Sequence, residues 1–130
     1  MNTEVMKKTT ADSLAGTMTF PEVVALLAAE GVESYHADLV KLEKTFYLPC
    51  GETFVETLDF EPPPISNDFS SAEVIAALRT IQARQINYQE FLRRIMGAGT
   101  TSYMVYLNGK KAIYVGRKGE FYVEDFPPAN

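Results

Sequence analysis

The sequence predicts an α+β fold in which a unit of two helices followed by three strands occurs twice. Three observations predict this fold. Helix-start patterns recur along the chain. Stretches of alternating apolar residues follow the helical stretches, as in strands with one buried face. Residues 18–39 also align without a gap with residues 86–107, at an offset of 68. An internal repeat of this kind is the first guide to the architecture.

The repeat consists of matching residue types in the same order. Gly31 aligns with Gly99 at the offset of 68. If one residue is omitted in a later loop, Lys44 aligns with Lys111, after which the original offset returns. We therefore interpret the two units as an internal duplication; chance similarity between two helix–strand units is the alternative.

The duplication predicts a single domain over residues 1–130, which is an ordinary size for one domain. Its two repeats are expected at about residues 3–60 and 70–127. Residues 61–69 begin with a proline-rich stretch and are expected to link the repeats.

The helices are predicted from their first turns. Three positions combine a capping side chain with Glu three residues later: Thr19 with Glu22, Ser70 with Glu73, and Asn87 with Glu90. Gly31 and Gly99 lie where a left-handed C-terminal cap is expected. The first helix, at about residues 3–14, has a thin apolar pattern and is placed by analogy with residues 71–84.

Three strands are expected after each pair of helices. In the second unit they cover residues 103–107, 112–115 and 120–124, with a hairpin signal at Asn108-Gly109. Each set reads as an antiparallel meander with helices packed on one face. Because three strands alone are marginally stable, we expect the two halves to share one sheet or one core.

Composition excludes several classes of site. One cysteine and one histidine allow neither an internal disulfide nor a Cys/His zinc site, and we expect no metal and no cofactor. The N-terminus lacks the apolar run of a signal peptide. The longest apolar stretch, residues 23–29, is far below the roughly 20 residues that span a bilayer. We therefore expect a cytoplasmic protein without a membrane partner.

Candidate site residues are few. His36 and Asp38 are two positions apart on a predicted strand and so share one face. A nearby carboxylate favours the charged form of an imidazole, which suits ligand binding or acid–base chemistry. We expect this candidate site on the open sheet face, with Tyr47 and Glu56 nearby. The alternative is a polar pair on a solvated surface.

Charge is divided unequally along the chain. Residues 1–65 carry four basic and eleven acidic residues, and residues 66–130 carry eight basic and six acidic residues. The net charges of −7 and +2 sum to −5. Complementary halves could attract within a monomer or between the subunits of a homodimer; a solvated surface without a role is the alternative.

Basic doublets and tyrosines interleave in the second repeat, which is an arrangement that can bind single-stranded nucleic acid. The doublets are Arg93-Arg94, Lys110-Lys111 and Arg117-Lys118, and the tyrosines are Tyr103, Tyr106, Tyr114 and Tyr122. The acidic chain as a whole argues against this partner, since a phosphate backbone is bound by net positive charge.

Several strings resemble a bacterial and prophage family of unknown function, often labelled phage-envelope-protein-like. The most specific are the Tyr35-His36-x-Asp38 string and the Gly119-Glu120 to Phe126-Pro127 string, and the resemblance extends from about residue 17 to residue 127. It implies a small cytosolic α+β protein. It implies no activity, cofactor or catalytic residue.

The sequence thus favours a non-enzymatic interaction or ligand-binding module of bacterial or prophage origin. One alternative is a small enzyme that uses His36 and Asp38. A second alternative is a nucleic-acid-binding protein that uses the second repeat. The sequence identifies no substrate and no specific partner.

Overall fold

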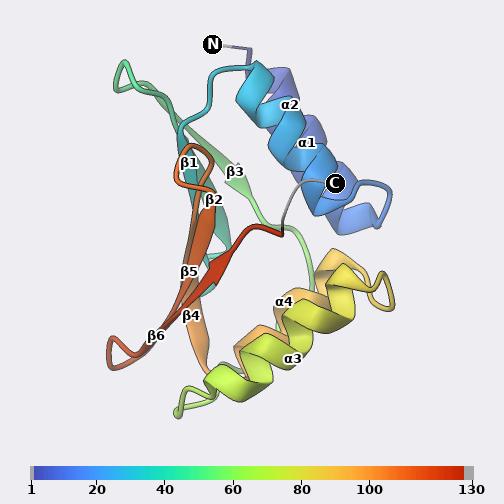
Figure 1. Cartoon of the computed structure of the whole chain (residues 1–130), viewed down its shortest axis with the longest axis vertical. Coiled ribbons are helices and arrows are strands. Elements are labelled where there is room, and N and C mark those ends of the chain that lie inside the picture. Colours follow the sequence, from blue (N-terminus) through green and yellow to red (C-terminus); the bar gives the residue numbers. More distant parts are fainter. Residues whose placement is uncertain (1, 128–130) are drawn as a thin grey trace.

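The computed structural model describes residues 2–127 and places both halves of the chain in one six-stranded sheet (Figure 1). The first half contains α1 (Thr3–Ala15), α2 (Phe20–Ala29), β1 (Ser34–Asp38), β2 (Glu43–Tyr47) and β3 (Thr53–Thr57). The second half contains α3 (Ser71–Gln82), α4 (Tyr88–Gly97), β4 (Thr100–Tyr106), β5 (Lys111–Gly116) and β6 (Phe121–Asp125). Residue 1 and residues 128–130 of the predicted domain lie outside the described residues.

The predicted α+β class is confirmed, because the sheet is antiparallel throughout and four helices pack on it. The strand order is β3-β2-β1-β4-β5-β6. Each half is a meander, and the two meanders join through the antiparallel pair β1 and β4. The expectation of a shared sheet is therefore confirmed. His36 and Met104 face each other at the centre of this pair.

The predicted helix starts are also confirmed. The side-chain oxygen of Ser70 accepts a hydrogen bond from the Glu73 amide at 3.2 Å. Asn87 caps α4 in the same way, and the Thr19 amide donates to the Glu22 carboxylate at 3.0 Å. These bonds satisfy amide groups that the first helical turn leaves free. Helix α3 ends at Gln82, before the expected residue 84.

One constant spacing relates the two halves. Helices α1 and α3 begin 68 residues apart, as do α2 and α4, and β3 and β6. Thr45 lies opposite His36 as Ile113 lies opposite Met104, so the spacing of 68 also holds in β2 and β5. The omission of one residue in the sequence alignment was therefore wrong, and the position equivalent to Lys44 is Ala112. The duplication itself stays a prediction, and a constant spacing is what it requires.

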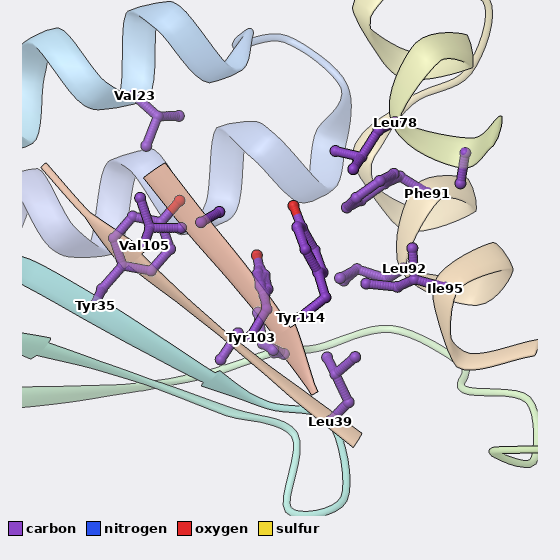
Figure 2. Close-up of a cluster of buried hydrophobic side chains, with 14 of the residues drawn as sticks. Val23, Tyr35, Leu39, Leu78, Phe91, Leu92, Ile95, Tyr103, Val105 and Tyr114 are labelled. Atoms are coloured by element: carbon purple, nitrogen blue, oxygen red, sulfur yellow. The ribbon is translucent and has the colours of Figure 1, made fainter. Parts of the chain in front are cut away.

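The hydrophobic core lies between the helices and one face of the sheet (Figure 2). Strand residues of both halves meet helix residues of both halves in one continuous cluster, and Figure 2 labels Val23, Tyr35, Leu39, Leu78, Phe91, Leu92, Ile95, Tyr103, Val105 and Tyr114. Met96 is 1% exposed, as its place in the apolar stripe of α4 predicts. The shared core makes each half a structural support for the other.

Candidate functional site

The face of the sheet opposite the helices is the candidate site, and we call it the open face. Figure 1 shows all four helices on the other side of the sheet. Directly opposite residues of antiparallel strands point to the same face. The register therefore puts one row of side chains across the middle of the open face: Val55, Thr45, His36, Met104, Ile113 and Val123.

The open face exposes large apolar side chains. Phe121 is 66% exposed, Val55 is 50% exposed, and Tyr106 and Val123 are nearly 40% exposed. Single exposed apolar residues are common on proteins, whereas a group of them on one uncovered surface is typical of an interaction site. A shallow hollow of about 540 Å³ lies at one end of this face, beside Tyr106, Lys111 and Ile113.

His36 and Asp38 both lie on the open face, but they act separately. His36 is half-buried between Thr45 and Met104 in the central row. One carboxylate oxygen of Asp38 accepts hydrogen bonds from the backbone amides of Val40 and Lys41, each at 3.0 Å. Asp38 therefore stabilises the turn between β1 and β2. No hydrogen bond joins His36 to Asp38 within residues 2–127.

Tyr47 and Glu56 lie on opposite faces of the sheet. Tyr47 is directly opposite Ser34, on the same face as His36. Glu56 is directly opposite Lys44, which points toward the helices. The expectation that Glu56 lies near His36 was therefore wrong. The expectation failed because side chains in a strand alternate between the two faces, so a shift of one position moves a side chain to the other face.

Sequence reasoning missed a buried lysine. Lys44 is 3% exposed, and its ammonium nitrogen lies 5.0 Å from the centre of the Tyr35 ring and 4.9 Å from that of Tyr88. Burial lowers the pKa of Lys44 to about 7. The two aromatic faces attract the charged form and so oppose this effect. Lys44 and Phe46 are two positions apart in β2 and so share one face of the sheet. The burial expected for Phe46 could therefore have indicated that Lys44 is buried.

The buried tyrosines around Lys44 form part of the core. The hydroxyl groups of Tyr88 and Tyr103 are hydrogen-bonded to each other. Burial raises the pKa of Tyr35, Tyr88 and Tyr103, so each stays neutral in the folded protein. The cluster lies under the helices, on the side of the sheet away from His36. It therefore contributes packing rather than a surface for ligands.

A second polar cluster, also missed, joins α3 to the edge strand β6. Arg79 donates to the Glu124 carboxylate at 2.6 Å, and Gln82 and the Tyr122 hydroxyl donate to it at 3.0 and 2.6 Å. Burial raises the pKa of Glu124, but these hydrogen bonds outweigh it, and the pKa is lowered overall. The cluster fixes the helix to the sheet edge.

The features that favoured nucleic-acid binding are dispersed. Tyr103 and Tyr114 are buried under the helices, 3% and 5% exposed, so their faces are closed to bases. Only Tyr106 of the strand tyrosines is exposed on the open face. Arg117 donates to the carbonyl oxygen of Ile65 at 2.9 Å, and Arg94 pairs with Glu90 of its own helix. One basic doublet, Lys110-Lys111, lies beside exposed Tyr106, and the other doublets and tyrosines of the second half do not extend this surface.

Residues 2–127 contain no group of three His, Cys, Asp or Glu side chains arranged to hold a metal ion. No helix in this part of the chain has the length and apolar run needed to cross a membrane. No family model and no curated protein matches the sequence. The resemblance to the phage-envelope-like family therefore stays a prediction.

Proposed function

We propose that this protein is a non-enzymatic interaction module that binds another protein surface through the open face. The observation that carries the proposal is the one-sided packing of the sheet. Four helices cover one face, and the other leaves Phe121, Val55 and Val123 in contact with solvent. Exposed apolar surface of this kind gains free energy when a partner covers it.

The geometry supports an enzyme less well. Acid–base catalysis requires a base within hydrogen-bond reach of its partner and of a reacting atom. The Asp38 carboxylate is held by two amides of its own turn, and His36 lies between Thr45 and Met104. An interaction surface needs only shape and apolar area at these positions. The small-enzyme alternative is testable through His36→Ala, which would abolish any such activity.

Duplication accounts for the size of the proposed surface. A three-stranded unit presents a narrow face, whereas two units joined at β1 and β4 present six strands in one sheet. We propose that the two halves descend from one such unit, in a cytosolic protein of bacterial or prophage origin. The constant spacing of 68 supports the common descent, and the family resemblance supports the setting.

A pull-down from the native host tests the proposed function. The tagged protein is compared with the variant Phe121→Lys/Val123→Lys, which puts charges on the open face. The matched control is Leu26→Lys, since Leu26 is 40% exposed on α2. We expect a protein captured by the wild type and the control and lost by the open-face variant. Equal capture by all three would overturn the proposal, provided that all three show the same circular dichroism spectrum.

A further inference from the structure

We propose that the partner of the open face is a second copy of this chain, stacked sheet against sheet about a two-fold axis. This inference rests on the proposed function and names its partner. Two charged corners of the open face carry it, one acidic and one basic. They lie in opposite halves and at opposite ends of the strands, so two copies can pair each corner with its complement.

The acidic corner is formed by Asp38 and Glu43. They are directly opposite each other on β1 and β2, and both side chains lie on the open face. Like charges at directly opposite positions repel. No ion pair reaches either carboxylate within residues 2–127, where the amide bonds to Asp38 are the only compensation. A cation supplied by a partner would relieve this repulsion.

The basic corner is formed by Lys110 and Lys111, beside Tyr106. Lys111 is exposed on the open face, directly opposite Tyr106, and Lys110 lies in the preceding turn. Tyr106 and Lys111 line the shallow hollow at this end of the sheet. Two acidic residues lie near this corner: Asp125, opposite Lys111 on β6, and Glu33, which also lines the hollow. Neither lysine forms an ion pair with these carboxylates within residues 2–127, so both ammonium groups can meet a carboxylate of a partner.

The positions of the corners select the geometry of the pair. In a two-fold dimer, each contact occurs twice with the roles exchanged. The acidic corner of one copy can cover the basic corner of the other only if the axis runs diagonally in the plane between the sheets. The strands of the two copies then cross near 90°, one of the two common ways in which sheets pack. The central row with His36 and Met104 lies in the middle of the contact.

The area of the face predicts a weak and reversible dimer. Strands of five residues at about 3.3 Å each are about 16 Å long, so two faces crossed near 90° overlap over roughly 270 Å² per copy. A standard interface buries about 800 Å² per partner, and smaller contacts are typical of transient complexes. We therefore expect a dissociation constant on the order of 100 μM.

Charge exchange between the corners tests the proposal. In the proposed dimer, Glu43 of each copy meets Lys111 of the other, so this attractive contact occurs twice. Glu43→Lys and Lys111→Glu each make both contacts repulsive, so each variant should stay monomeric. The double variant Glu43→Lys/Lys111→Glu restores attraction and the original net charge of −5. The two positions lie on β2 and β5, separated by β1 and β4, so they are about 14 Å apart or more and cannot pair within one copy. Rescue by the double variant must therefore act between copies.

Sedimentation velocity over about 5 to 500 μM protein measures the outcome. We expect the average mass of the wild type and of the double variant to rise with concentration from 14.5 kDa toward twice that mass. The dissociation constant of either dimer should be at least tenfold lower than that of either single variant. Leu26→Lys should behave as the wild type. A monomeric wild type at the highest concentration, or single variants that dimerise as the wild type does, would overturn the second-copy proposal. If the wild type stays monomeric while the pull-down captures a different protein that Phe121→Lys/Val123→Lys loses, the proposed function stands and only its partner changes.

Discussion

Gly31 and Gly99 lie 68 residues apart, each after the second helix of its half, with left-handed φ values of +85° and +90°. A side-chain carbon on Gly31 would meet no atom within 4 Å. The same carbon on Gly99 would clash with the backbone of Asp68 and lie 2.8 Å from the Phe69 Cα. Equivalent positions in the two halves thus have one backbone conformation and different surroundings.

The linker between the halves causes this difference. The Ser70 amide donates to the Ala98 carbonyl oxygen at 2.8 Å, and the Ser66 amide donates to that of Met96 at 3.1 Å. These bonds hold residues 66–70 against the end of α4. Within residues 2–127, no segment packs against Gly31 in this way. The connection between the two halves is therefore part of the packing of the second half.

Charged positions differ between the halves as well. Glu124 is bonded by Arg79, Gln82 and Tyr122, whereas its equivalent Glu56 receives no hydrogen bond or ion pair within residues 2–127. Buried Lys44 occupies the position of Ala112. The first half therefore carries a buried cation, and the second half carries a paired anion at its sheet edge. Both differences can be tested at equivalent positions.

The largest effect is expected for Gly99→Ala. Left-handed backbone costs a residue with a Cβ about 1–2 kcal/mol, and the clash with Asp68 and Phe69 adds about 1–3 kcal/mol. Gly31→Ala carries only the first cost. Urea unfolding should therefore show a loss of about 2–5 kcal/mol for Gly99→Ala and about 1–2 kcal/mol for Gly31→Ala. Equal losses at the two positions would contradict the role assigned to the linker.

Lys44→Met is expected to stabilise the protein. The substitution removes a buried cation and keeps the apolar length of the side chain, while it loses the attraction of the Tyr35 and Tyr88 rings. The net gain in the free energy of unfolding at neutral pH should be about 1–3 kcal/mol. Lys41→Met, at an exposed position, is the matched control and should change stability by less than about 0.5 kcal/mol.

The gain from Lys44→Met should depend on pH. The pKa of Lys44 is lowered to about 7 in the folded protein, against 10.5 in the unfolded chain. Between these values the unfolded chain binds the extra proton, so wild-type stability rises with pH. The advantage of Lys44→Met should therefore be greatest below pH 7 and shrink toward about pH 9. An advantage that is constant over this range would show that Lys44 does not change its charge there.

The sequence predicted the elements because their signals are local. Capping at Ser70 and Asn87 depends on residues three positions away, and both caps are present. The hairpin at Asn108-Gly109 was also local, although its loop covers residues 107–110, between the paired Tyr106 and Lys111. Local signals of this kind are independent of the rest of the fold.

The candidate site was predicted less well because it depends on register. The side of the sheet on which Glu56 lies depends on its pairing with Lys44, and it is the neighbouring Val55 that lies on the open face. The alignment that placed Lys44 with Lys111 was a separate error of one residue. A shift of one position in a strand moves every side chain to the other face. The pairing of Arg79 with Glu124 joins residues 45 positions apart, so no sequence spacing could indicate it.

The smallest effect is expected at the two equivalent glutamates. Glu124→Gln removes a charge that Arg79 and Tyr122 stabilise, and because Arg79 is half exposed the loss should be only about 1 kcal/mol at neutral pH. Glu56→Gln is the matched control, with a change of less than about 0.5 kcal/mol. The pKa of Glu124 is lowered in the folded protein, so its contribution is present above the unfolded value of 4.5 and is lost as the pH falls through the folded value. Urea unfolding of the wild type and Glu124→Gln should therefore differ at neutral pH and converge in acid. A difference that persists in acid would assign the effect to the shape of the side chain rather than to its charge.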